Sequence, residues 1–384
     1  MSGLTPIRRV VTGHDAHGRS TVQWDGPAPN QHEASLGSGR GHTDIWVWHE
    51  TPLPIHGTSD DGNLKYMFSG PPGGGHFRVV QARAKPADYD RAKDPDVIAP
   101  HPPKPRAGGH GLWDRGGNSL FESAMHKTQT LDYGIVINNG RDLVLDDCRL
   151  PMRVGDTVCQ VGAWHQWCFP EGAQMAFDMI WADYGPDGKG LAVGSDKPLP
   201  APDLPAGVKP ARRIVSIDRV EGRGELVSDT AAPDVRVDPA RPGFAVHRLW
   251  VADSHPAKMV YETLHLPHTL EPPANGSVCR VFDYPPDTAW QAKVGEAEVK
   301  AYFRMMGSPG ASTYAANAPH PYMQKTRTVD FVCILEGEIT LVLETQAVPM
   351  KQGEIAVLRG ANHAWSNRSA RPARISVCSH DGKY

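Results

Sequence analysis

The sequence lacks the features of membrane-spanning, secreted and nucleic-acid-binding proteins. None of its apolar runs approaches the roughly 18 residues that cross a bilayer, and its first residues lack the apolar segment of a signal peptide. Lys and Arg number 40 against 43 Asp and Glu, so no excess of cations is present to neutralise phosphates. We therefore expect a cytoplasmic protein that binds neither nucleic acid nor membrane.

Cysteine is also scarce, and no pair has the CxxC spacing of a metal or redox motif. The six cysteines in 384 residues are too sparse for a disulfide scaffold, so we expect free, buried thiols. Glycine (39) and proline (35) are plentiful, which argues against long helical bundles. The 40% hydrophobic content is enough for packed cores. Together these features favour an all-β protein with turn-rich loops.

An internal repeat sets the domain organisation. Residues 125–169 align without a gap with residues 323–367, and 15 of the 45 positions are identical. The likeness extends upstream, because an Arg-Arg strand at Arg8-Arg9 resembles one at Arg212-Arg213. We therefore predict two domains, 1–204 and 205–384, joined by a proline-rich linker. The irregular stretch 85–111 has no counterpart in the second half and is interpreted as an excursion or lid.

Within each repeat the pattern is that of short β-strands. Segments of five to eight residues rich in Val, Ile and Leu alternate with Gly, Asn or Asp, which is typical of a sandwich or barrel. GEAEVKAYFRMM, at 295–306, is the best candidate for a helix. The strands expected from the repeat are DYGIVIN, DLVLDD and DTVCQVG in the first half, and FVCILEG, ITLVLET and EIAVLRG in the second.

At these strands the sequence resembles the cupin superfamily. The second half contains a strand followed by QGEIAVLRGANHAWSN, which is similar to the second cupin motif, Gly, Pro-x-Gly, His, Asn. The resemblance implies a bicupin, an all-β chain of two tandem double-stranded β-helix (jelly-roll) barrels. The expected Pro is replaced by Gln160 and Leu358, and Phe169 stands where the first half would have Asn. The matching positions are Gly155, Gly162 and His165 in the first half, and Gly353, Gly360, His363 and Asn367 in the second.

The resemblance also implies a metal site in the first barrel. Carried over position by position, the cupin ligands fall on His126, Asp132 in place of Glu, and His165, with Thr128 replacing the second His. If the strand is regular, residues 126, 128, 130 and 132 share one face. Two imidazoles and one carboxylate suit Fe(II) with open positions, and would also suit Zn, Mn or Ni. We predict that these three residues are catalytic and bind a divalent transition metal, with Fe(II) favoured.

The matching positions of the second barrel form a degenerate site. There the first His is replaced, and one imidazole and one carboxylate hold a transition metal poorly. We therefore expect that only the first barrel binds metal and that the second is largely scaffold. The four positions are Gln324, Thr326, Asp330 and His363.

Side chains near the predicted metal are candidates for binding substrate. Strand alternation places Trp167 and Phe169 on the same face as His165, where they suit a flat organic molecule. Thr128, Thr130 and Tyr133 are the other candidates. Ordinary roles remain open for all of these residues. The Thr-x-Thr-x-Asp pattern occurs in both barrels and is compatible with a structural role, and the histidines and aromatic residues could belong to the cores.

Three functions remain open at this stage. The first is a metal-dependent enzyme acting on a small organic substrate, aromatic or a carboxylic or keto acid, by dioxygenase-type chemistry. The second is a lyase, isomerase or hydrolase in which the metal acts as a Lewis acid. The third is a metal-free bicupin that binds a small molecule without catalysis. The pattern is compatible with either a monomer or a homodimer.

Overall fold

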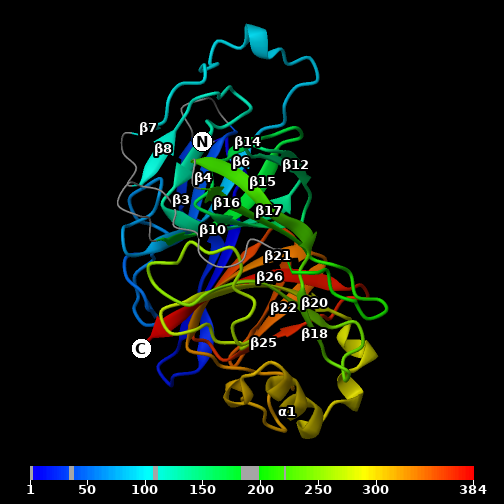
Figure 1. Ribbon diagram of the computed structural model, residues 1–384. Coiled ribbons are helices and arrows are strands. Elements are labelled where there is room, and N and C mark those ends of the chain that lie inside the picture. Colours follow the sequence, from blue (N-terminus) through cyan, green and yellow to red (C-terminus); the bar gives the residue numbers. More distant parts are fainter. Residues whose placement is uncertain (1–2, 34–38, 107–110, 183–198, 220–221) are drawn as a thin grey trace.

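Two large β-sheets dominate the computed structural model, which describes residues 3–33, 39–106, 111–182, 199–219 and 222–384. They pack face to face, and three small sheets complete the described fold (Figure 1). The first large sheet has the spatial order β17 (Arg223–Ala231), β16 (Arg212–Arg219), β13 (Thr157–Val161), β10 (Thr130–Asn138), β15 (Ala173–Trp181), β6 (Gly75–Ala82), β4 (Gly41–Trp48), β3 (Asn30–Glu33).

The second large sheet repeats this arrangement with strands mainly from the second half of the sequence. Its order is β18 (Asp234–Val237), β19 (Ala245–Ala252), β20 (Ser277–Tyr284), β26 (Ala373–Lys383), β21 (Thr328–Glu336), β24 (Ile355–Arg359), β1 (Arg8–His14), β2 (Ser20–Pro27), and β5 (Leu53–Pro54) pairs with β26.

Each large sheet closes against a small one to form a barrel. The small sheet of the first barrel contains β12 (Arg149–Met152), β11 (Arg141–Val144) and β14 (Gln166–Cys168). That of the second contains β23 (Ala347–Lys351), β22 (Glu338–Leu343) and β25 (His363–Ser366). The fold is therefore a tandem pair of double-stranded β-helix barrels, as predicted. A further small sheet, of β7 (Lys104–Pro105), β8 (Leu112–Asp114) and β9 (His126–Thr128), lies beside the first barrel.

Helix is confined to short segments. The predicted helix is confirmed as α1 (Glu296–Met305), and its first turn is stabilised by the Glu298 carboxylate, which accepts a hydrogen bond from the Gly295 amide at 2.9 Å. Among the described residues, no helix has the length and apolar character that crossing a membrane requires. The remaining helical turns are η1 (Arg91–Lys93), η2 (Asp287–Ala289), η3 (Gln291–Lys293) and η4 (Pro309–Ala311).

The two halves of the chain exchange their first hairpins. The β1–β2 hairpin joins the second barrel, where β1 pairs in parallel with β24, and the β16–β17 hairpin joins the first barrel, where β16 pairs in parallel with β13. In Figure 1 β16 and β17 lie among the upper strands, and the blue N-terminal strands run alongside the orange and red ones. Each barrel is therefore completed by residues from the other half of the sequence.

The repeated Arg-Arg pair explains how each hairpin is held. Arg212 forms ion pairs with Asp229 of its own hairpin at 2.7 Å and with Asp156 of the first half at 2.8 Å. Its neighbour Arg213 is buried and pairs with Glu262 at 2.8 Å. The same arrangement recurs at β1, where Arg8 pairs with Asp25 and Glu354, and Arg9 with Asp60.

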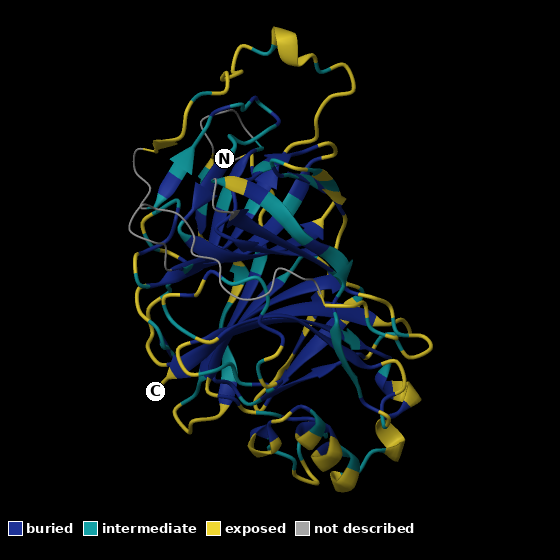
Figure 2. Ribbon diagram, in the orientation of Figure 1, coloured by how far each residue is buried: buried dark blue, intermediate teal, exposed yellow. Residues whose placement is uncertain are grey.

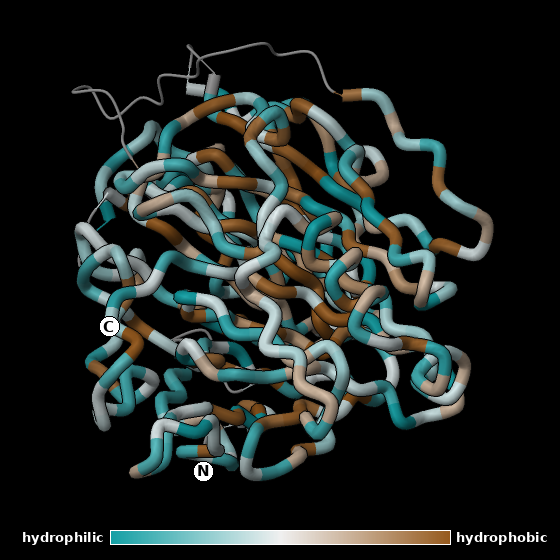
Figure 3. Tube along the Cα trace, turned by 90° about the horizontal axis from the view of Figure 1, so that it is seen from below, coloured by the Kyte–Doolittle hydropathy of each residue, from teal (hydrophilic) through white to brown (hydrophobic). Residues whose placement is uncertain are grey.

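Strand alternation divides the apolar side chains among three cores. On β16, Ile214 enters the interior of the first barrel, whereas Val215 enters the layer between the two large sheets. On β1, Val10 enters the interior of the second barrel, and Val11 enters the shared layer. The strands are correspondingly buried (Figure 2), and brown, hydrophobic stretches of chain run through the molecule (Figure 3). All six cysteines are free and five of them are buried, as the sequence predicted.

Candidate active site in the first barrel

A cavity of about 330 Å³ opens into the first barrel. Its volume lies at the lower end of the range for small-molecule sites. Its walls are formed by residues of β4, β6, β8, β9, β10, β11, β14 and β15, together with the segments 98–106 and 116–124. The lining includes four histidines (His42, His101, His126, His165), five cationic residues (Arg40, Arg78, Lys104, Arg106, Arg141), three acids (Asp114, Glu122, Asp132) and four aromatic residues (Phe68, Trp167, Phe169, Phe177).

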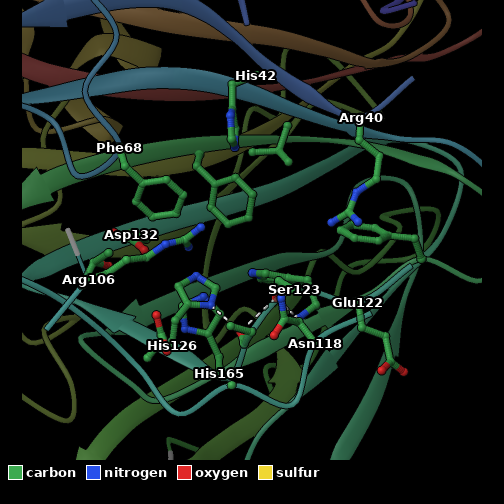
Figure 4. Close-up of a pocket in the computed structure, with 18 of the residues that line it drawn as sticks. Arg40, His42, Phe68, Arg106, Asn118, Glu122, Ser123, His126, Asp132 and His165 are labelled. Atoms are coloured by element: carbon green, nitrogen blue, oxygen red, sulfur yellow. Dashed lines mark hydrogen bonds between the residues drawn. The ribbon is translucent and has the colours of Figure 1, made fainter. Parts of the chain in front are cut away.

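Two of the predicted ligands, His126 and His165, lie directly opposite each other. Their backbones form an antiparallel bridge, with N–H to carbonyl distances of 2.8 and 2.9 Å. The ring centroids are 4.3 Å apart, and Figure 4 shows the imidazoles side by side on one wall, across the cavity from His42 and Phe68. The structure therefore brings together two residues that are 39 positions apart in the sequence.

Backbone carbonyls fix the orientation of both imidazoles. His126 donates from Nδ1 to the Ala124 carbonyl at 2.7 Å, and His165 donates from Nδ1 to the Ala163 carbonyl at 2.8 Å. A carbonyl only accepts, so each Nδ1 carries the proton and each Nε2 keeps a lone pair. Within the described residues neither Nε2 has a hydrogen-bond partner. Histidines that bind metals are commonly held in this way.

Both imidazoles are kept neutral by their surroundings. Burial lowers the pKa of His126 to about 4, and the hydrogen bond to the Ala124 carbonyl only partly opposes this effect. Burial also lowers the pKa of His165 well below its ordinary value, and the neighbouring His126 adds to the effect. Because only neutral imidazole binds a metal, both side chains are ready to do so at neutral pH.

The third predicted ligand, Asp132, lines the same cavity but does not join the pair. In the parts of the chain that the structure describes, no three His, Cys, Asp or Glu side chains lie together as a ligand group. Gln129 separates β9 from β10, and its amide donates a hydrogen bond to the Gly111 carbonyl, but His126, Thr128 and Asp132 still line the same cavity. Metal binding by His126, Asp132 and His165 together therefore stays a prediction.

Asp132 is nevertheless an unusual carboxyl group. Its side chain is buried, and Oδ1 has no hydrogen-bond partner among the described residues. Burial raises the pKa of Asp132 to about 7, against the opposing effect of a hydrogen bond from Thr130, and the carboxylate of Asp178 raises it further. Near neutral pH this group can therefore either give or take a proton.

This raised pKa predicts a pH-dependent effect of Asp132→Asn. A carboxyl group whose pKa is raised by folding favours the folded state at low pH, and that contribution is lost as the pH rises from about 4 through about 7. Metal-free Asp132→Asn should therefore become more stable than the wild type as the pH rises, by on the order of 3 kcal/mol above pH 7. Denaturant unfolding at pH 5 and pH 8 measures the difference, and an equal difference at both pH values would contradict the shift.

The predicted substrate-binding residues divide into two groups. Thr128, Trp167 and Phe169 line the cavity, and the ring of Trp167 meets that of His165 edge to face at 5.8 Å. Thr130 bonds the Thr128 hydroxyl at 2.7 Å and is not part of the lining. Tyr133 lies on the opposite face of β10, in the layer between the sheets, where its hydroxyl bonds Ser277 at 2.9 Å. Tyr133 is therefore corrected to a core residue.

The corresponding site in the second barrel is closed. Gln324 and His363 form the same backbone bridge, but the Gln324 amide lies 3.4 Å from Nε2 of His363, and Nδ1 of His363 bonds the Ala361 carbonyl. Thr326 bonds Thr328, which donates to Asp330 at 3.0 Å. The remaining cavity is only about 30 Å³. Both nitrogens of the imidazole are thus engaged, and little space is left for a ligand.

The irregular stretch 85–111 contributes to the mouth of the cavity in its described part. It projects from the top of the first barrel (Figure 1) and returns so that Ile98, His101, Lys104 and Arg106 line the cavity. His101 bonds Asp114 at 3.0 Å, which fixes this return. Residues 107–110 lie outside the described residues. No local motif predicts these lining residues, because they come from irregular chain.

The two imidazoles fit a divalent transition metal. Their free Nε2 atoms, carbonyl-bound Nδ1 atoms and neutral state are the donor properties that Fe(II), Zn, Mn and Ni accept. Oδ1 of Asp132, which has no hydrogen-bond partner among the described residues, is an oxygen atom of the type that binds such metals. It lies in the same cavity but does not form a three-residue ligand group with the two histidines. The second barrel offers no comparable pair, because Gln324 occupies the position of His126.

The chain is similar to proteins described as cupin-domain oxidoreductases. One of these, virC of Hypocrea virens, is 29% identical over 174 residues, which are 43% of this chain and 68% of that protein. Phomopsin biosynthesis cluster protein C' of Diaporthe leptostromiformis is 46% identical over 48 residues. That match spans 12% of this chain and only 25% of the fungal protein.

Comparison with solved structures finds cupin-fold proteins. A deletion mutant of Bacillus subtilis oxalate decarboxylase aligns over 92% of this chain and 76% of its own, with 9% identity and a TM-score of 0.37. No family model matches the chain.

Proposed function

We propose that this bicupin is a divalent-metal-dependent oxidoreductase that acts on a small organic molecule in the first-barrel cavity. The observation that carries the proposal is the facing pair His126 and His165, each with Nδ1 bonded to a carbonyl and Nε2 free. The likeness to cupin-domain oxidoreductases supports the class of reaction. A dioxygenase-type reaction with Fe(II) is the specific form that we propose.

The residues of the cavity have separate roles in this proposal. His126 and His165 would hold the metal, which when bound supplies redox chemistry if it is iron and Lewis-acid chemistry if it is zinc. Trp167 and Phe169 provide flat apolar surface against which a substrate ring can pack. Asp132, with its pKa raised to about 7, can hold or release a proton at Oδ1, and its role as a metal ligand remains a prediction.

Iron reconstitution tests the proposal. Purified protein is stripped with a chelator, loaded anaerobically with Fe(II), Zn(II), Mn(II) or Ni(II), and then given oxygen with a panel of aromatic carboxylic acids and keto acids. We expect substrate-dependent oxygen uptake with Fe(II) only. Turnover with zinc and without oxygen uptake would instead favour a lyase, isomerase or hydrolase.

The metal-free alternative gives a different result in the same preparation. A small-molecule-binding bicupin without catalysis would retain only traces of any transition metal when purified without chelator. The trace metal content would also be the same in the His126→Ala variant. That outcome would overturn the proposed function and leave the fold as described.

A further inference from the structure

Arg141 is a charged residue at a position where the second barrel has an apolar residue. It begins β11, is only 2% exposed and lines the first-barrel cavity. The repeat aligns it with Ile339, which is equally buried in the core of the second barrel. Since the two barrels share their fold, the arginine is not required to build the strand.

Arg141 also lacks a counter-ion. Among the described residues its Nε and Nη1 atoms have no hydrogen-bond partner, and it forms no ion pair. Its guanidinium carbon lies 4.1 Å from the ring centroid of Phe169 and 4.8 Å from that of Trp167. Such contacts with ring faces stabilise a buried cation only in part. An isolated charge in a buried site is costly unless an anion accompanies it.

A second buried arginine strengthens the positive charge at this end of the cavity. Arg40 is 8% exposed, and its guanidinium carbon lies 5.4 Å from the ring centroid of Phe169. Its hydrogen bonds go to the carbonyls of Ser119 and Leu120 rather than to a carboxylate. The strand register aligns Arg40 with Phe244, so both arginines replace apolar residues of the second barrel.

Most other charges of the cavity are already paired, although Lys104 and Arg106 have no ion pair among the described residues. Arg78 binds Asp44 at 2.5 Å, and Asp114 binds His101 at 3.0 Å. Glu122 pairs with Arg91. Asp114 and Glu122 are therefore not available as counter-ions for Arg141 or Arg40. Asp132, whose pKa is raised by burial, is not paired with either of these two arginines.

We propose that Arg141, assisted by Arg40, binds the carboxylate of an aromatic acid substrate. A guanidinium offers two parallel N–H donors to a carboxylate, and the rings of Trp167 and Phe169 flank the place where the attached aromatic group would lie. The inference rests on the proposed function for the reaction that follows binding. It names the substrate class, an anionic aromatic acid of a size that fits about 330 Å³.

Calorimetric titration of the full chain, as purified, with benzoate and with the neutral isostere benzamide tests this inference. Wild-type protein should bind benzoate saturably and benzamide at least tenfold more weakly. Arg141→Met should weaken benzoate binding at least tenfold and leave benzamide unaffected. The matched control is Arg149→Met, an exposed arginine on the neighbouring strand, which should bind benzoate as the wild type does.

Three results would overturn the inference: no saturable benzoate binding by the wild type, equal binding of benzamide, or benzoate binding within twofold of the wild type in Arg141→Met. If Arg141→Met does not fold, Arg141→Lys keeps the charge without the paired donors and should bind with intermediate affinity, and unchanged affinity would again contradict the role. The titration requires no turnover, and the metal content is measured separately. A failure of the proposed metal site can therefore be distinguished from a failure of the proposed carboxylate site.

Discussion

His126→Gln is expected to remove bound metal and to lower the rate of substrate oxidation at least a hundredfold. The second barrel already shows what glutamine does at this position, because the Gln324 amide lies 3.4 Å from Nε2 of His363 and engages it. The same contact in the first barrel would leave one imidazole engaged and the other ligand absent. Since a single imidazole holds a transition metal poorly, metal content and activity should fall together.

The matched control is His363→Gln in the second barrel. His363 is buried with both nitrogens engaged, so its loss should lower stability but leave metal content and rate within about twofold of wild type. Elemental analysis and oxygen uptake are measured on the same preparations. Equal loss of metal from both variants would show that the second barrel also holds metal.

Ile214→Ala should destabilise the first barrel, although Ile214 belongs to the second half of the sequence. Its side chain is fully buried in the interior of that barrel, in the same apolar cluster as Trp167 and Phe169 of the cavity. Removing a buried branched side chain costs about 2–5 kcal/mol, because lost burial and the resulting void add together. The cavity should loosen as well, so the KM for substrate should rise.

Hydrogen exchange followed by mass spectrometry localises this effect. In Ile214→Ala the amides of β10, β13 and β15 should exchange faster, while those of β21 and β24 keep the wild-type rate. Val10→Ala is the matched control, because Val10 occupies the equivalent place in the interior of the second barrel. It should produce the reverse pattern. Faster exchange confined to the second barrel in Ile214→Ala would contradict the exchange of hairpins.

Local pattern was sufficient to predict the strands, the helix and the duplication. The repeat also indicated the Arg-Arg strands, but not the barrel that each strand joins. Parallel pairing of β16 with β13 depends on contacts across more than 50 residues, and nothing in the sequence of either strand specifies its partner. The proline-rich linker suggested a boundary between residues 204 and 205, and the first hairpin of each half joins the barrel on the other side of that boundary.

The candidate site was predictable to the extent that it follows strand alternation. The motif predicted that His126 and His165 point into the same barrel, where they form an isolated antiparallel bridge, and the alternation of β14 turns Trp167 toward the same cavity. Asp132 lines the same cavity as His126, as the shared strand face predicted, but the break at Gln129 depends on its hydrogen bond to Gly111 and could not be derived. The repeat aligns Arg141 with Ile339, but the sequence does not show that the arginine is buried. Only the structure shows this burial, on which the proposed role of Arg141 depends.

The central claim is that metal binds in the first barrel and not in the second. Anomalous diffraction from crystals of the wild-type protein, collected above and below the absorption edge of the bound metal, tests it most directly. The account predicts one anomalous peak within bonding distance of Nε2 of both His126 and His165. A peak at His363, or a peak in the first barrel that is remote from either imidazole, would contradict it.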